Sequence, residues 1–302
     1  MTDVLRIDNL VKSFGTTRVI DNISLTVPAG SVYGFIGENG AGKTTTMKMV
    51  LGLLRPDAGQ VHICDEPVRF GMTKTNRFVG YLPDVPEFYN YMRAREYLRF
   101  CGEIVGLNSK DISARSRELL ELVGLDGVRK RIGAYSRGMK QRLGVAQALI
   151  NKPRLLICDE PTSALDPVGR KEVLDILSQI HGDTTVVFST HVLSDVERVC
   201  DRAAVLHKGQ IVLDGTLAEL KARHGSSGLH IEFAHPNDTA RFCELIAPGL
   251  VTEHTASDVT LCTVDAQTEM ATLRLLSDND ILPVKFESLA PSIENLFLEA
   301  VS

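Results

Sequence analysis

The sequence predicts an α/β fold followed by a second, smaller α+β domain, and three observations favour this prediction. A short apolar stretch, a glycine-rich loop and a helical stretch follow one another over residues 32–51. Two further apolar runs, at residues 154–158 and 184–189, are typical of buried strands in a parallel sheet. After a Gly-Ser linker at residues 225–228, strands and helices alternate in a shorter pattern.

Composition narrows the class of protein. The chain has 302 residues, which is enough for one large and one small domain, and its net charge of -5 argues against nucleic acid as the main partner. Its six cysteines include no C-x-x-C pair, so we expect neither a zinc site nor disulfides, as in a cytoplasmic protein. We find no signal segment and no apolar run of the ~20 residues that span a bilayer. Any action at a membrane would then need spanning helices from another chain.

The N-terminal segment is expected to form strands. Alternation and turn residues predict strands at residues 4–7, 18–20 and 23–27, with turns at 14–15 and 28–30. Phe14 lies in the first of these turns, where its ring could stack on a purine. A buried loop aromatic is an equally good interpretation from the residues alone.

The glycine-rich loop carries the strongest chemical signal in the chain. It fits the phosphate-loop pattern G-x-x-x-x-G-K-S/T without a mismatch, between a predicted strand at 32–36 and a predicted helix from residue 46. Inward-pointing N–H groups and a helix N-terminus favour phosphate, while a lysine adds charge and a threonine hydroxyl can bind Mg²⁺. We therefore predict a nucleotide site made by Gly37, Glu38, Asn39, Gly40, Ala41, Gly42, Lys43, Thr44 and Thr45.

Residues from about 87 to 150 differ in character from their surroundings. Strands are predicted before them at 60–63 and 78–82, whereas helical spacing runs through 96–105, 113–123 and 138–150. This pattern predicts a helical insert between two parts of an α/β core.

Two acidic residues follow the apolar run that resumes the core. Asp159 and Glu160 would lie at the carboxyl end of a central strand, where open α/β sheets bind ligands. Asp159 could hold Mg²⁺, and Glu160 could deprotonate a water that attacks a phosphorus atom. The alternative interpretation is a solvated acidic turn. The phosphate loop in the same chain strongly favours the functional interpretation.

His191 follows the next apolar strand. A histidine at a strand end beside the Asp159 strand could contact a γ-phosphate and stabilise charge in the transition state. A lone histidine is more often structural, but this position favours function. Helices are expected at 167–180, 192–200 and 217–224, with a hairpin around Lys208-Gly209.

The C-terminal part has the order β-α-β-β-α-β of a ferredoxin-like half-barrel. Nothing in it resembles a catalytic group, so we interpret it as a packing or dimerisation module. A last amphipathic stretch is expected at 292–301. The predicted strands are 229–233, 251–254, 259–264 and 282–286, and the predicted helices are 237–246 and 267–276.

Residues 4 to about 222 resemble ATP-binding cassette proteins, the nucleotide-binding subunits of ABC transporters. The motifs occur in the family's order: an aromatic at Phe14, a Walker A loop at 37–45, a Q-loop position at Asp84, a signature at 135–142, Walker B at 155–159, a D-loop at 163–166 and a switch histidine at His191. By this resemblance Glu160 is the general base, and Phe14 and Val19 contact ATP.

The resemblance implies a P-loop NTPase cassette at residues 4–224. It would contain an antiparallel β subdomain, a RecA-like parallel-sheet core and the helical subdomain, joined by the linker to a C-terminal α+β domain at 229–302. It also implies a head-to-tail dimer with two Mg·ATP sandwiched between subunits. Each site would then combine the Walker residues of one chain with Ser136, Arg137, Gly138 and Met139 of the other, and Asp166 would lie at the interface.

Two departures from the family pattern are informative. Asp84 stands where most members have Gln, and its shorter carboxylate leaves a contact with Mg²⁺ open. Arg137 and Met139 replace the usual signature Gly and Gln, giving a form that resembles the second class of ABC exporters, which includes drug, sodium and copper-related systems. The stretch at 291–298 resembles that subgroup's C-terminal motif, which is linked to subunit assembly.

The resemblance therefore implies an ATPase subunit of an exporter. It would work with a second copy of itself or a homologous ATPase subunit, and with an integral membrane permease, at the inner face of the cell membrane. Two alternatives are a soluble cassette ATPase without a permease and an importer ATPase with a regulatory C-terminal domain.

Overall fold

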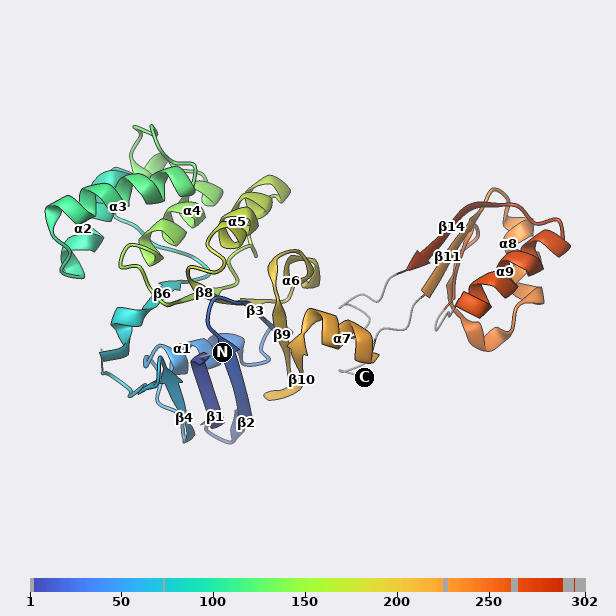
Figure 1. The fold of residues 1–302 in the computed structure, drawn as a ribbon, viewed down its shortest axis with the longest axis horizontal. Helices are drawn as coiled ribbons and strands as arrows, with labels where there is room; N and C mark the ends of the chain where they lie inside the picture. The colour runs from blue at the N-terminus through green and yellow to red at the C-terminus, as the bar shows by residue number, and fades with distance from the viewer. Residues whose placement is uncertain (1–2, 73, 225–227, 262–265, 290–295, 297–302) are drawn as a thin grey trace. The chain divides into compact units, whose positions relative to one another are not determined.

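The computed structural model describes residues 3–72, 74–224, 228–261, 266–289 and 296. Contacts within the chain divide it into two compact units, one ending at Leu217 and the other beginning at Ala218 (Figure 1). Most of the expected linker, residues 225–227, lies outside the described residues, as does the amphipathic stretch at 292–301 apart from the buried Leu296.

The first unit begins with an antiparallel sheet in the order β2-β1-β4-β5. Its strands are β1 (Asp3–Phe14), β2 (Thr17–Pro28), β4 (Ala58–Ile63) and β5 (Glu66–Pro67). The expectation of separate strands at 18–20 and 23–27 is wrong, because β2 runs through both. Asn22 adopts a positive φ of 57° at an irregularity in the β1–β2 register, which lets one strand continue where the alternation breaks.

The core sheet has six strands in the order β10-β9-β3-β8-β7-β6. They are β3 (Val32–Ile36), β6 (Val79–Leu82), β7 (Leu155–Asp159), β8 (Thr185–Thr190), β9 (Arg202–His207) and β10 (Gln210–Thr216). Every residue of β3, β7 and β8 is buried, which explains why apolar residues predominate in these strands. These strands pair in parallel with β8 in the middle, so their carboxyl ends meet at one edge.

Helix α1 (Lys43–Val50) connects the two sheets of this unit. Its residues Met47, Met49 and Val50 share a buried cluster with side chains of β1, β4 and β7. The helix therefore starts at the carboxyl edge of the core sheet and is fixed along its length by packing on both sheets.

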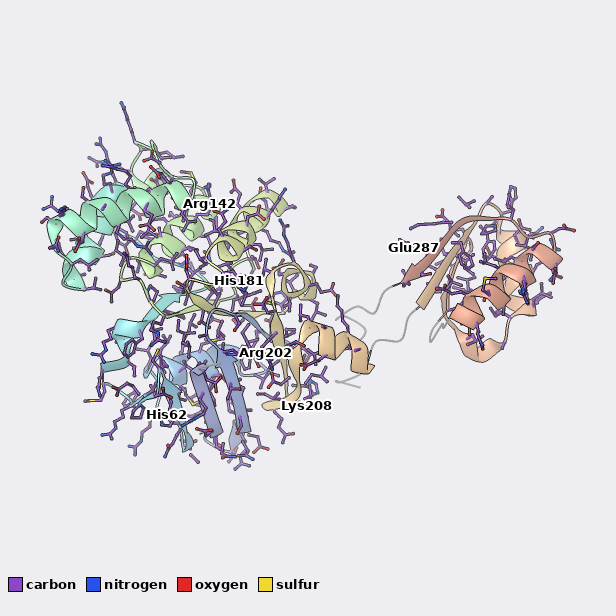
Figure 2. All side chains as sticks on the ribbon, viewed as in Figure 1. His62, Arg142, His181, Arg202, Lys208 and Glu287 are labelled. Atoms are coloured by element: carbon purple, nitrogen blue, oxygen red, sulfur yellow. The ribbon has the colours of Figure 1, made fainter. Side chains whose placement is uncertain are left out.

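The helical insert contains α2 (Ala94–Ile104), α3 (Ser109–Leu122) and α4 (Arg137–Ala148), which confirms the three helices expected there. Helix α3 starts earlier than its apolar spacing indicates, because the side chain of Asn108 caps it by accepting the Asp111 N–H. Arg142 of α4 donates to the carbonyl of Val123 at 2.6 Å and pairs with Glu172 of α5 (Pro167–Gln179) (Figure 2). The insert is thus tied to the core unit through α4.

The second unit contains β11 (Gly228–Phe233), α8 (Pro236–Leu245), β12 (Val251–His254), β13 (Asp258–Leu261), α9 (Ala266–Asp278) and β14 (Pro283–Leu289). Its sheet is antiparallel in the order β12-β13-β11-β14, so the predicted β-α-β-β-α-β order is confirmed. Leu229, Ile231 and Phe233 of β11 alternate into a core with Phe242 of α8. The short α7 (Leu217–His224) crosses the division between the units.

Candidate nucleotide site

The glycine-rich loop follows β3 at the carboxyl edge of the core sheet. The N–H of Gly37 donates to the carbonyl of Thr190 at the end of β8, at 3.3 Å. Gly42 has a φ of 111°, and a Cβ on it would lie 2.5 Å from the Cδ1 of Ile20. The loop therefore needs glycine at this position for both conformation and space.

The N-terminus of α1 fits an anion. No side chain caps this helix, and its first turn contains no acidic residue. The N–H groups at the start of a helix have no intrahelical partner, and the helix dipole adds partial positive charge there. A phosphate group would satisfy these donors, so the loop and helix fit the phosphates of a nucleotide.

Lys43 lies folded over the loop and is only 5% exposed. Its Nζ donates to the carbonyls of Gly37 at 2.6 Å and Glu38 at 3.1 Å. The same nitrogen forms an ion pair with Oε1 of Glu160 at 3.0 Å. The ammonium group is thereby held between the phosphate loop and the acid that follows β7.

Glu160 lies between two nitrogen-bearing side chains. Its Oε2 is 2.9 Å from Nδ1 of His191, and its Oε1 pairs with Lys43. Its backbone adopts a φ of 47°, and its N–H donates to the carbonyl and the hydroxyl of Ser189 at 3.1 and 3.0 Å. The sheet thus brings together three residues that the sequence analysis selected separately.

Asp159 is 4% exposed and lies at the last position of β7. Its Oδ1 accepts a hydrogen bond from the Ser189 hydroxyl at 2.6 Å. Thr44, in the first turn of α1, is exposed. A carboxylate and a hydroxyl oxygen are the hard ligands that Mg²⁺ prefers, and Mg²⁺ commonly takes its other ligands from substrate phosphates and water. The donor chemistry of these two residues therefore fits a Mg·nucleotide.

Phe14 ends β1 and is 50% exposed, so the buried loop aromatic that the sequence left open is wrong. The Nζ of Lys12 lies 5.4 Å from its ring centroid. Val19, on β2, packs against the buried core cluster, and its carbonyl lies close to Gly42. Phe14 thus presents an accessible aromatic face.

The signature residues surround the start of α4. Ser136 caps this helix, with its Oγ accepting the Met139 N–H at 3.2 Å. Ser136, Arg137, Gly138 and Met139 line one pocket together with Ala164, Leu165 and Asp166 of the D-loop. Asp166 caps α5 by accepting the Gly169 N–H at 3.2 Å. None of residues 37–45 lines this pocket, so the start of α4 lies apart from the phosphate loop within one chain.

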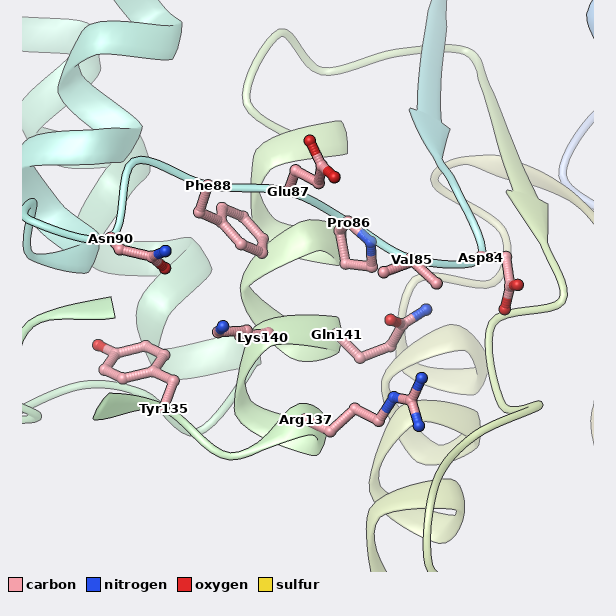
Figure 3. Close-up of a pocket in the computed structure, with 10 residues that line it drawn as sticks. All are labelled: Asp84, Val85, Pro86, Glu87, Phe88, Asn90, Tyr135, Arg137, Lys140 and Gln141. Carbon is pink, nitrogen blue, oxygen red and sulfur yellow. The ribbon is translucent and has the colours of Figure 1, made fainter. Parts of the chain in front are cut away.

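Asp84 follows β6 and lines a larger pocket of about 590 Å³ between the segment after β6 and α4 (Figure 3). Its Oδ1 accepts a hydrogen bond from the hydroxyl of Ser163 at 2.6 Å. Arg137 and Gln141 of α4 line the same pocket. Asp84 therefore connects the loop after β6 with the loop after Glu160.

Comparison with known proteins places these features in one family. The family model described as "ABC transporter" matches residues 20–163. The uncharacterized ABC transporter ATP-binding protein YxlF of Bacillus subtilis is 46% identical over 219 residues, which are 72% of this chain and 72% of that protein. The chain belongs to the ABC transporter ATP-binding proteins. As a member of this family it is an ATPase.

This ABC ATP-binding protein also resembles a relative along its whole length. The bacitracin transport ATP-binding protein BcrA of Enterococcus faecalis is 33% identical over 305 residues, covering 100% of this chain and 97% of that protein. A solved structure titled "Structure of ATP binding subunit of ABC transporter" superposes with a TM-score of 0.66 at 29% identity, covering 73% of this chain and 92% of that one. The predicted cassette fold is thereby confirmed.

The sequence analysis of this ABC ATP-binding protein missed Ser189. Its hydroxyl donates to Asp159 and accepts the N–H of Glu160, so one side chain of β8 orients both acids. A second missed group is Thr162, whose hydroxyl donates to the buried Asp195 at 2.7 Å, while Arg170 pairs with Asp195 at 2.6 Å. The available signal for Ser189 was a polar residue directly after the apolar run at residues 186–188.

No helix in the described part of this ABC ATP-binding protein combines the length and the apolar character that a bilayer crossing requires.

Proposed function

We propose that this chain hydrolyses Mg·ATP with Glu160 as general base and thereby drives a separate membrane permease that exports its substrate. The carboxylate of Glu160, held between Lys43 and His191 at the carboxyl edge of the core sheet, is the observation that carries this proposal. The likeness of the whole chain to the BcrA protein, whose name includes bacitracin transport, supports a transport role.

Each side chain of the site has a distinct role in this proposal. The N–H groups of the loop and Lys43 bind the outer phosphates, and Phe14 with Val19 contacts the adenosine part. Glu160 accepts the proton of the attacking water, and His191 donates a hydrogen bond to the γ-phosphate. Thr44 and Asp159 would hold Mg²⁺, which would supply positive charge against the phosphate oxygens.

We infer that two chains must meet to complete each site. The N-terminus of α4 offers a hydroxyl and N–H groups, but its pocket is lined by the D-loop of its own chain and by none of residues 37–45. A head-to-tail dimer would bring Ser136 and Gly138 of the partner chain to the γ-phosphate, with Asp166 at the interface. The partner is a second copy or a homologous ATPase subunit.

Dimerisation is testable by light scattering after size-exclusion chromatography. Glu160→Gln with Mg·ATP should have the mass of two chains, and without nucleotide the mass of one. Adding Gly138→Asp should keep the mass of one chain with Mg·ATP, because the new carboxylate repels phosphate. The fold should tolerate this change, since a Cβ on Gly138 lies 3.8 Å from the nearest atom and acids suit a first helical turn.

An unaltered ATP affinity in the Gly138→Asp form is the control for this experiment. A dimer that persists in Gly138→Asp, or a Glu160→Gln form that stays monomeric with saturating Mg·ATP, would contradict the composite site.

We further propose that the chain acts at the inner face of the cell membrane, because its permease must lie in the bilayer. The proposed reaction uses no residue of the second unit, residues 218–300, which would then serve assembly or regulation. The BcrA protein of E. faecalis covers this part of the chain too, which supports a shared role for it in transport ATPases.

A further inference from the structure

We propose that Asp84 positions the general base Glu160 through Ser163 instead of binding Mg²⁺. This inference rests on the proposed role of Glu160. Asp84 is a positioning residue in this proposal, because its hydrogen-bond partner is Ser163. The phosphates and the attacking water are contacted by other residues, such as Lys43 and Glu160.

A short chain of hydrogen bonds connects Asp84 with the base. Oδ1 of Asp84 accepts the Ser163 hydroxyl at 2.6 Å, a length typical of an O–H donor on a carboxylate. The N–H of Ser163 donates to the carbonyl of Glu160 at 3.2 Å. Ser163 is therefore the only residue between the Asp84 carboxylate and the backbone of Glu160 along this path.

The backbone of Glu160 needs such support. Its φ of 47° lies in the left-handed region, which a residue with a side chain adopts only when its surroundings hold it there. On the N-terminal side, Ser189 holds the N–H of Glu160. On the C-terminal side, the support comes from the turn that closes between the carbonyl of Glu160 and the N–H of Ser163.

Thr162 and Ser163, the last two residues of that turn, are fixed differently. Thr162 is bonded to Asp195, which is 2% exposed and paired with Arg170, so this contact is shielded from water. Ser163 and Asp84 are both exposed, and their hydrogen bond can open to solvent at little cost. The Asp84 contact is thus the adjustable part of the support of Glu160.

The position of Asp84 links this support to the pocket between the segment after β6 and α4. Asp84 begins the segment that continues through Val85, Pro86, Glu87 and Phe88 along the pocket wall (Figure 3). A displacement of this segment would move the Asp84 carboxylate away from Ser163. The structure therefore offers a route by which the pocket changes the geometry of the base.

The test compares steady-state ATP turnover of Asp84→Ala, Ser163→Ala and the double variant across a Mg²⁺ titration. Each single variant should lower kcat about 3- to 10-fold, the loss expected for one exposed hydrogen bond to a charged group, with KM for ATP unchanged. The double variant should lose no more than either single one, because both changes remove the same bond. The Mg²⁺ concentration for half-maximal turnover should stay that of the unaltered protein.

Two further variants sharpen the comparison. Asp84→Asn keeps an oxygen that accepts the Ser163 hydroxyl and should recover most of the lost kcat. Glu87→Ala removes another carboxylate of the same pocket and should leave kcat unchanged. Thermal unfolding of all variants should match that of the unaltered protein, since both partners of the bond are exposed.

A raised Mg²⁺ requirement in Asp84→Ala, but not in Ser163→Ala, would overturn the proposal and make Asp84 a metal ligand. Additive losses in the double variant, or an unchanged kcat in Asp84→Ala, would overturn it as well. Glu160→Gln is measured alongside. Full turnover in Glu160→Gln would refute the proposed function itself. If turnover is lost in Glu160→Gln, the role of Glu160 stands, and the Asp84 variants then decide the positioning role of Asp84 alone.

Discussion

Glu160→Gln is expected to lower ATP turnover by about 10²- to 10⁴-fold, the usual contribution of a general base. The amide keeps the size of the side chain but cannot accept the proton of the attacking water. ATP affinity should remain within a fewfold of the original, because the phosphate loop and Lys43 are untouched. Phosphate release measures turnover, and a fluorescent nucleotide measures binding.

Glu121→Gln is a suitable control, since Glu121 is exposed on helix α3 and should tolerate the same change without loss of turnover. Turnover that survives in Glu160→Gln would show that another group takes the proton.

Lys43→Ala is expected to weaken ATP binding by about 10- to 100-fold. Hydrogen bonds that involve a charged group contribute about 1.5–3 kcal/mol, and 1.4 kcal/mol corresponds to a factor of ten. The ammonium group of Lys43 is buried, whereas the other lysine of α1, Lys48, is exposed. Isothermal titration with Mg·ATP measures the dissociation constants of Lys43→Ala and of the unaltered protein for ATP.

Lys48→Ala provides the matched control on the same helix and should bind ATP as the unaltered protein does. Equal affinities for Lys43→Ala and the original protein would mean that the loop binds phosphate without the ammonium charge, contrary to the proposed site.

Much of the fold could be predicted because its signals are local. The phosphate loop lies between a buried strand and a helix. The runs at residues 155–158 and 186–188 are apolar, as is typical of strands buried on both faces. Parallel pairing then brings the ends of β3, β7 and β8 together, so the juxtaposition of Lys43, Glu160 and His191 could be anticipated.

The remaining contacts could not be predicted, because they join loops far apart in the sequence. Asp84 and Ser163 are 79 positions apart, and nothing in either segment indicates their hydrogen bond. The role of Ser189 was equally hard to predict, since its hydroxyl donates to Asp159, which lies 30 positions earlier on the neighbouring strand. The continuous β2 strand was missed because a positive φ at Asn22 absorbs the irregularity in its alternation.

Recovery of the Glu160→Gln form from detergent-solubilised membranes with Mg·ATP tests the central claim most directly. A tagged chain is captured together with its partners, which mass spectrometry identifies, and Gly138→Asp serves as the form that does not close on ATP. We expect a polytopic membrane protein as the main partner. Recovery with ribosomes or DNA, and without any membrane protein, would contradict the transport role.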